Sequence, residues 1–312
     1  MTQEAAVKDH QELPGEGAGL TPSRISGKTR LIGLFGSPVS HSHSPTMHNT
    51  CFEAMGFDFA YLAFDVKEED AENAVKAIRL LNLRGANITM PIKRTVIPHL
   101  DRLTPAAELA GAVNVVVNDD GVLTGHVTDG EGFMLSLAEA GVEYAGGHMV
   151  ILGAGAAAVS VAVQAALDGV RRITIFNRKD PFFDAAEERI SRLNDRLDCT
   201  FALHDLDDER LLKEQMATAD ILVNGTPIGM KATIDQTALP GLDLLRPELV
   251  VCDLVYVPEM TRLLKEASAR GCKIVSGMGM QLFQAAPAFE MWTGQKMDLT
   301  IARATLRSRA DP

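Results

Sequence analysis

The feature that most constrains the fold is a glycine-rich turn between a short apolar strand and a helix. The strand is predicted at 148–152, and the helix runs from the turn to about residue 167. Gly153 permits the tight turn, Gly155 lets phosphates approach the backbone, and Ala158 stands at the third small position of the motif. The free N–H groups at the start of such a helix bind a pyrophosphate. We therefore predict a dinucleotide site whose first contacts are Gly153, Ala154, Gly155, Ala156 and Ala157.

The end of the next strand selects between the two nicotinamide cofactors. This strand, 172–176, ends in Asn177-Arg178-Lys179-Asp180. An acidic residue about 20 positions after the glycines binds the ribose hydroxyls of NAD, whereas an arginine accommodates the 2′-phosphate of NADP. Asp180 favours NAD, and Arg178 favours NADP. Because this tip has no Ser or Thr to donate to a phosphate, we predict NAD, with NADP as the alternative. In the plainer interpretation these charges only end a strand and open a helix. The cofactor candidates here are Asn177, Arg178 and Asp180.

Strands and helices alternate through the rest of this region, which predicts a doubly wound parallel sheet. The strands are expected at 199–204, 221–224, 249–254 and 273–275, and the helices at 182–193, 208–217 and 260–270. A turn at 225–230 is placed to border the nicotinamide. We therefore assign a Rossmann-type domain to 129–278 and add Thr226, Val255, Gly277 and Met280 to the cofactor contacts.

An earlier set of strands and helices predicts a separate α/β domain. At 312 residues the chain exceeds what one core usually organises. The strands are expected at 30–35, 58–66, 85–89, 112–117 and 122–128, and the helices at 46–55, 68–81 and 131–140. We assign the first domain to 31–128, joined by C-terminal helices at 279–308.

The stretch 84–93, RGANITMPIK, carries the strongest candidate for chemistry. Pro91 ends the strand and suits the first turn of a helix. Asn87, Thr89 and Lys93 then lie at a strand-to-helix corner, where open α/β sheets bind small ligands. Most lysines are simply solvated. A lysine held at such a corner can instead transfer protons.

A carboxylate downstream is a candidate partner for Lys93. Asp129 lies in Thr128-Asp129-Gly130, at the end of a strand. It could cap the helix that follows, and it could pair with Lys93, and the two roles are compatible. Asn114 lies within the strand predicted at 112–117.

The loop after the first strand is rich in hydroxyl groups and imidazoles. Ser42 or Ser44 could cap the helix predicted at 46–55, with Pro45 at its first position. Capping explains one serine, whereas two suit a polyhydroxylated ligand. His41, His43 and His48 lack a fourth partner at metal spacing, so no metal site is predicted.

Charge and composition narrow the function classes. The formal charge of −11 argues against nucleic acid or an anionic membrane as partner. The four cysteines form no close pairs, which favours free thiols in a reducing compartment, and we expect a cytoplasmic protein. The sequence has no apolar run of the roughly 18 residues that a membrane span needs. Residues 1–30 carry no signal-peptide core, and their Gly, Pro, Glu and Lys content predicts a mobile tail.

Several unusual strings, in this order, resemble the shikimate/quinate dehydrogenase family over about residues 30–308. They are GSPVSHSHSPTMHN at 36–49, NITMPIK at 87–93, AVN at 112–114, TDG at 128–130, GAGAAA at 153–158, NGTPIGM at 224–230, DLVYVPEMT at 253–261 and GMGMQLFQ at 277–284. Two positions depart from the family pattern. Val127 stands where many members have Asn, and Gln281 stands where a large apolar residue is usual.

The resemblance implies a substrate site in the first domain and a nicotinamide cofactor in the second. It implies that Lys93 and Asp129 are the catalytic pair. The substrate contacts that it implies are Ser42, Ser44, Thr89, Asn114 and Gln284, to which we add Tyr256. The tip at 177–180, followed by two phenylalanines, resembles the branch that uses NAD and accepts quinate.

We therefore expect reversible oxidation of shikimate, quinate or both, with hydride transfer to NAD and proton transfer through Lys93 and Asp129. The expected assembly is a monomer or a homodimer. One alternative is a dehydrogenase for an amino- or deoxy-analogue of shikimate. Another is a non-catalytic NAD-binding module, which would not need the pair of Lys93 and Asp129.

Overall fold

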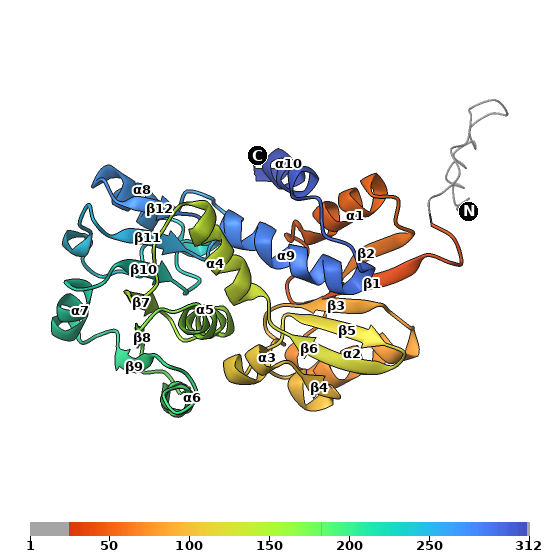
Figure 1. The fold of residues 1–312 in the computed structure, drawn as a ribbon, viewed down its shortest axis with the longest axis horizontal. Coiled ribbons are helices and arrows are strands. Elements are labelled where there is room, and N and C mark those ends of the chain that lie inside the picture. The colour runs from red at the N-terminus through yellow and green to blue at the C-terminus, as the bar shows by residue number, and fades with distance from the viewer. Residues whose placement is uncertain (1–24, 182, 311–312) are drawn as a thin grey trace, which may run out of the picture.

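The computed structural model describes residues 25–181 and 183–310, which form two α/β domains with a sheet in each (Figure 1). The predicted fold class is therefore confirmed. The strands are β1 Arg30–Gly36, β2 Phe59–Asp65, β3 Gly85–Ile88, β4 Arg102–Leu103, β5 Val115–Asp119, β6 Val122–His126, β7 His148–Leu152, β8 Arg172–Asn177, β9 Thr200–Asp205, β10 Ile221–Asn224, β11 Val250–Asp253 and β12 Lys273–Val275.

The helices alternate with these strands. They are α1 Ser44–Ala54, α2 Ala71–Leu80, α3 Pro105–Ala110, α4 Asp129–Glu139, α5 Ala156–Leu167, α6 Phe183–Leu193, α7 Glu209–Met216, α8 Arg262–Ala269, α9 Gly277–Thr293 and α10 Leu299–Ala310. Between them, the described residues also form the short 3₁₀ helices η1 Glu68–Asp70, η2 Ile97–His99, η3 Lys231–Thr233 and η4 Leu242–Leu244.

The first sheet has the strand order β2-β1-β3-β5-β6-β4. β1, β2 and β3 are parallel, because α1 and α2 cover the crossovers between them. β5 and β6 are antiparallel and are joined by a tight turn at Asp120 and Gly121, both with positive φ. An Asp-Gly pair with positive φ at both positions is the usual turn of a two-residue hairpin.

The second sheet has the order β12-β11-β10-β7-β8-β9, and all of its strand pairs are parallel. The chain runs outward from β7 to β9 and then returns to β10, on the other side of β7. The order of the strands therefore reverses between β7 and β10. This is the doubly wound arrangement, which binds ligands at the carboxyl ends of the strands flanking the reversal.

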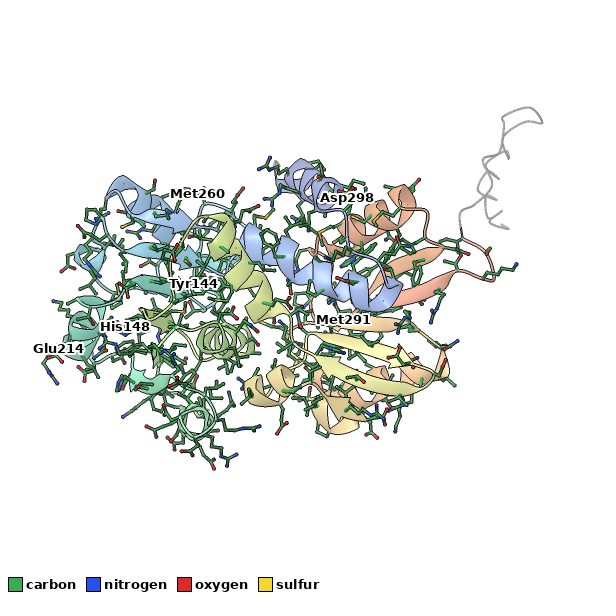
Figure 2. The ribbon with its side chains drawn as sticks, in the orientation of Figure 1. Tyr144, His148, Glu214, Met260, Met291 and Asp298 are labelled. Atoms are coloured by element: carbon green, nitrogen blue, oxygen red, sulfur yellow. The ribbon has the colours of Figure 1, made fainter. Side chains whose placement is uncertain are left out.

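Two helices connect the domains (Figure 1). α4 packs its apolar side chains into the core of the second sheet, whereas most of the buried side chains of α9 join the core of the first. The two helices also pack against each other. The C-terminal segment therefore returns to the first domain, as Met291 and Asp298 illustrate in Figure 2.

The prediction that a helix begins at Pro91 is wrong. Residues 90–96 form successive turns and lead into η2. The carbonyl of Lys93 accepts a hydrogen bond from Val113 N, and Ile97 N bonds to Arg94 O instead. Because the Lys93 carbonyl is used between segments, an α-helical ladder cannot form through it.

Three local boundaries also differ from the predictions. Thr128, not Asp129, is the N-cap residue of α4, because the Asp129 carboxylate is engaged with side chains described below. His43 is the N-cap residue of α1, so neither serine caps it and Pro45 is its second residue. Asn114 lies just before β5, although its carbonyl still accepts from Ile88 N.

The predicted tail 1–30 ends too late, because Arg30 already belongs to β1 and Thr29 Oγ1 donates to Asp58 Oδ1 at 2.6 Å. Residues 1–24 and Phe182, the predicted first residue of α6, lie outside the described residues. The prediction also missed β4 and α3, which are short. All four cysteines are buried and unpaired. In the part of the chain that the structure describes, no helix has both the length and the apolarity to cross a bilayer.

Candidate active site

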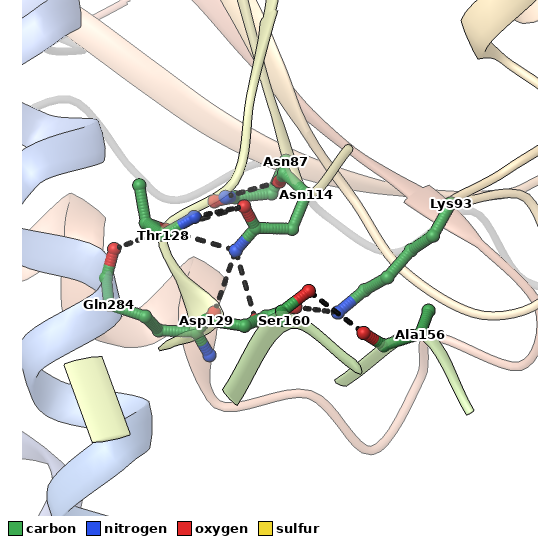
Figure 3. Close-up of polar contacts among 8 residues, drawn as sticks. All are labelled: Asn87, Lys93, Asn114, Thr128, Asp129, Ala156, Ser160 and Gln284. Atoms are coloured by element: carbon green, nitrogen blue, oxygen red, sulfur yellow. Dashed lines mark hydrogen bonds and ion pairs between the residues drawn. The ribbon is translucent and has the colours of Figure 1, made fainter. Parts of the chain in front are cut away.

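The topology of the first sheet gathers polar side chains at one edge. β1 and β3 are parallel, so the segments that follow them leave the sheet on the same side. β5 runs antiparallel to β3 and therefore begins at that edge, to which β6 returns the chain. Lys93, Asn114 and Asp129 consequently meet there, between the two domains (Figure 3).

Lys93 and Asp129 form an ion pair, in which Lys93 Nζ donates to Asp129 Oδ2. The side chain of Asp129 is 2% exposed and that of Lys93 is 13% exposed. A buried carboxylate is tolerated only when partners compensate for its lost hydration, and Lys93 supplies that charge. The amine is therefore held at a defined point while part of it stays accessible, which suits proton transfer.

Asn114 connects this pair to α9. Its Nδ2 lies 3.0 Å from Asp129 Oδ1, from Thr128 Oγ1 and from Gln284 Oε1. Its Oδ1 accepts from Thr128 N at 2.7 Å. An amide nitrogen carries two hydrogens, so three acceptors share them and each is held close. One side chain thus orients the carboxylate, the start of α4 and Gln284.

A second chain of hydrogen bonds runs from Asn114 to β2. Asn87 Nδ2 donates to Asn114 O at 3.1 Å, and Tyr61 OH donates to Asn87 Oδ1 at 2.6 Å. Burial raises the pKa of Tyr61, and a hydrogen bond with Ser44 opposes that shift. His48 stacks on Tyr61 at a centroid distance of 4.6 Å, and burial lowers the pKa of His48 to about 3.

Sequence reasoning did not select Tyr61, His48 or Thr128 as site residues. Tyr61 lies in a strand that was correctly predicted, but a strand pattern signals burial and not the partner of a hydroxyl group. His48 was considered only as a metal ligand. Thr128 belongs to the TDG string, which was the available signal for it.

The other predicted substrate contacts lie around this network. Ser42 and Ser44 are half-buried, and Ser42 Oγ accepts from Ser44 N at 3.3 Å. Thr89 lies against the end of β1. Tyr256, in the second domain, meets His43 edge-to-face at 6.4 Å between ring centroids, and burial raises the pKa of Tyr256. The loop after β1 thus contacts the second domain beside β11.

The glycine turn of the second domain has room for a diphosphate. Gly153 has φ +95°, and a Cβ there would lie 2.9 Å from Thr226 Cγ2. Gly155 is the N-cap of α5 without a side-chain cap, and nothing lies within 4 Å of the position that its Cβ would take. Ala158 packs against Gly225, which brings α5 close to β10. The first N–H groups of α5, from Ala156 and Ala157 onward, are therefore not used by a side-chain cap and fit a dinucleotide.

The tip after β8 presents both signs of charge. Asn177 Oδ1 accepts from Ala154 N at 3.2 Å and so ties the tip to the glycine turn. Arg178, Lys179 and Asp180 are exposed. The carboxylate and both cations are therefore accessible to a ribose or to a phosphate.

The remaining cofactor candidates lie at the neighbouring strand ends. Thr226 Oγ1 donates to Asn224 Oδ1 at 2.7 Å. A Cβ on Gly277 would lie 2.6 Å from Val255 O, so the start of α9 touches the end of β11. Sequence reasoning missed Asp253 at the end of β11, whose carboxylate accepts a hydrogen bond from Val255 N at 2.9 Å. Burial raises the pKa of Asp253 to about 6.

Two residues named in the sequence analysis, the cofactor candidate Met280 and the departure from the family pattern at Val127, are mainly packing residues. Met280 is buried in the core of the second sheet. Val127, where the family often has Asn, packs against the cores of both domains instead of forming a side-chain hydrogen bond. Among residues 25–181 and 183–310, no group of three or more His, Cys, Asp or Glu side chains is arranged to hold a metal ion.

A cavity of about 290 Å³ lies away from the ion pair. It is bordered by α4, α9 and α10, and Glu139 and Arg303 form an ion pair in its lining. Because the lining includes neither Lys93 nor Asp129, this cavity is not part of the candidate site.

A doubly wound sheet with an open glycine turn, beside a domain that holds a lysine–carboxylate pair, defines a class: two-domain oxidoreductases that use a nicotinamide dinucleotide. A family model described as the shikimate dehydrogenase substrate binding domain matches residues 34–116. A shikimate dehydrogenase (NADP⁺) of Listeria monocytogenes is 50% identical over 283 residues, which cover 91% of this chain and 97% of that protein. The chain belongs to the shikimate dehydrogenase family.

Solved structures agree with this assignment. Shikimate 5-dehydrogenase from Listeria monocytogenes, in complex with shikimate and NAD, superposes with a TM-score of 0.87 at 49% identity, covering 92% of this chain and 99% of that one. Quinate dehydrogenase from Corynebacterium glutamicum, in complex with NAD, superposes with a TM-score of 0.81 at 32% identity, covering 90% and 99%.

Proposed function

We propose that this protein catalyses the reversible oxidation of shikimate to 3-dehydroshikimate, of quinate to 3-dehydroquinate, or of both. Family membership supports the reaction class. The single observation that carries the proposal for this chain is the ion pair of Lys93 and Asp129, which Asn114 holds at the edge where the domains meet. A bound nicotinamide ring supplies the hydride acceptor for oxidation and the hydride donor for reduction.

Lys93 and Asp129 handle the proton in this proposal. When the secondary alcohol loses a hydride from carbon, its hydroxyl proton passes to the pair, and a ketone results. In the reverse direction charged Lys93 returns a proton to the forming alkoxide. Asp129 holds the amine in place, and Asn114 keeps the carboxylate oriented.

The proposed substrate contacts are polar side chains from both domains. Ser42, Ser44 and Thr89 present hydroxyl groups from the first domain. Gln284 presents an amide from α9, and Tyr256 a phenol from the second domain. A polyhydroxylated acid needs a donor or acceptor for each of its groups, and this set supplies both kinds.

We propose NAD as the preferred cofactor, with NADP as the alternative. Asp180 is exposed at the tip after β8, where a carboxylate binds ribose hydroxyls and repels a 2′-phosphate. Arg178 and Lys179 attract a 2′-phosphate, so the preference between NAD and NADP depends on the balance of charges at this tip.

The proposed domain limits are 31–128 together with 279–308 for the substrate domain, and 129–278 for the dinucleotide domain. The hydrophobic clusters support this division. Phe133 and Leu137 of α4 lie in the core of the second sheet, whereas Phe289 and Leu306 lie in the core of the first. We also propose a cytoplasmic location, which the four free thiols favour.

Steady-state rates measured at 340 nm with shikimate and quinate, each with NAD and NADP, test the proposal. We expect turnover of both acids and a higher kcat/KM with NAD. Activity with NADP alone would refute the interpretation of Asp180. Dinucleotide binding without turnover of either acid would refute the proposed function and favour a non-catalytic module or a dehydrogenase for a shikimate analogue.

A further inference from the structure

Two arginines, one from each domain, approach each other beside the glycine turn. Arg94 directly follows Lys93, and its Nη2 lies 3.4 Å from the carbonyl oxygen of Ala154. Arg189 extends from α6 past the end of α3, where its Cδ would lie 3.7 Å from a Cβ on Gly111. Burial lowers the pKa of Arg189, and the positive charge of Arg94 lowers it further, so the two guanidinium groups interact.

Neither arginine has an anionic partner among the described residues. Arg94 Nε and Arg189 Nη1 are buried and make no hydrogen bond. Burial also lowers the pKa of Arg94. Buried nitrogen donors without acceptors are costly, and two like charges held together add repulsion.

Two other partly buried arginines, Arg84 and Arg246, contrast with this arrangement. Arg84 donates from Nε, Nη1 and Nη2 to the carbonyls of Trp292, Asn118 and Met291. Arg246 donates to the carbonyls of Met216 and Ala219. Arg84 and Arg246 thus find backbone acceptors, whereas Arg94 and Arg189 retain buried donors for a further acceptor.

The position of the pair indicates which acceptor is missing. Ala154 lies between the two glycines of the turn that opens α5, where a dinucleotide places its phosphates. A guanidinium group matches phosphate oxygens with parallel N–H donors. A 2′-phosphate would instead bind at the tip after β8, which has its own cations, Arg178 and Lys179.

We propose that Arg94 and Arg189 together bind the pyrophosphate of the dinucleotide. The inference extends the proposed function by adding a cofactor contact from the substrate domain. The anionic cofactor then replaces a repulsion between the domains with an attraction. Because the pyrophosphate is common to both nicotinamide cofactors, the pair does not discriminate between them.

Titrations of NADH and NADPH fluorescence, without substrate, measure this contribution. Arg94→Gln and Arg189→Gln remove one charge each, and each should weaken the binding of both cofactors about tenfold or more, as the loss of a charged hydrogen bond predicts. Arg102→Gln in β4 and Arg192→Gln in α6 are matched controls, because both side chains are exposed. They should bind both cofactors as the wild type does. Arg94→Lys should recover part of the loss.

The outcomes separate this inference from the proposed function. Unchanged binding in both glutamine variants would overturn the pyrophosphate assignment, and so would a loss confined to NADPH. The unfolding midpoint without cofactor should not fall in either variant, because each removes a like-charge contact. If the wild type oxidised neither acid, the proposed function would fail while these titrations kept their meaning. If it oxidised them and the variants bound normally, only this inference would fail.

Discussion

Asn114 is the residue on which the geometry of the polar network depends. It is 2% exposed, and its amide contacts Asp129, Thr128 and Gln284 at the same distance. A buried amide with all of its bonds made is rigid, because any rotation would leave a donor or acceptor unpaired. The carboxylate of Asp129 is therefore presented to Lys93 in one orientation.

Replacing Lys93 by Ala should lower kcat by about 10²–10⁴ while shikimate binding is largely kept. The physical reason is that the variant removes the proton-carrying group and keeps the surrounding polar contacts. Steady-state kinetics and equilibrium binding of shikimate measure the two quantities separately, and the binding also reports on folding. Lys76→Ala, on the exposed face of α2, is the control. Near-normal turnover in Lys93→Ala would remove this lysine from the mechanism.

Replacing Gln281 by Leu should stabilise the protein by about 1 kcal/mol, because a buried acceptor without a donor is removed. Gln281 is 4% exposed, and its Oε1 has no hydrogen-bond donor among the described residues. Urea unfolding measures the change. Gln284→Leu is the contrasting variant and should lose stability, because it breaks the bond to Asn114. A loss of stability in Gln281→Leu would show that this side chain is satisfied.

At the scale of elements, the placement of α4 depends on close backbone contacts. A Cβ on Gly130 would collide with the carbonyl oxygen of Ser160 in α5, and a Cβ on Gly132 would lie 2.5 Å from Gln284 N in α9. Gly130 and Gly132 lie in the first turn of α4, one and three residues after Asp129. The helix therefore holds the carboxylate in place by touching one neighbour from each domain.

Replacing Gly132 by Ala should destabilise the protein by about 1–3 kcal/mol, the usual cost of forcing atoms into a packed interface. It should also lower turnover, because α9 must shift and carries Gln284 with it. Chemical denaturation and kcat measured together test both effects. Gly27→Ala is the matched control, since nothing lies within 4 Å of its Cβ position. Wild-type stability and turnover in Gly132→Ala would disprove the proposed role of this contact.

At the scale of the whole molecule, each domain buries one neutral imidazole. Burial lowers the pKa of His48, in the first domain, to about 3. It lowers the pKa of His148, in the second domain and labelled in Figure 2, to about 4. An unfolded histidine titrates near 6.5. Between these values the unfolded chain binds more protons than the folded one, so stability falls as the pH drops below about 6.5.

The unfolding free energy at pH 5 should therefore be lower than at pH 7, by about 2 kcal/mol for each histidine. Asp253 acts in the opposite sense: its pKa is raised to about 6, so the folded state gains about 1 kcal/mol over the same interval. Urea unfolding at the two pH values measures the net change. His48→Phe, which keeps the stacking on Tyr61, should remove about 2 kcal/mol of the acid sensitivity. An unaltered pH dependence in that variant would contradict the assignment.

Local patterns in the sequence predicted both sheets and the glycine turn, because hydrophobic period and glycine placement act over a few residues. They placed β7, β10 and β12 at their observed limits. They failed where a distant partner decides the backbone. The segment after Pro91 is not helical because Val113 bonds to the carbonyl of Lys93.

The sequence by itself determined which chemical groups are present and which strand ends carry them, together with the family to which the chain belongs. Only the tertiary structure decided that Tyr61, Asn87 and Asn114 form one hydrogen-bonded chain, and that Arg94 meets Arg189. The physical reason is that hydrogen bonds, desolvation and charge repulsion depend on distance in space. Sequence spacing does not encode that distance between separate elements.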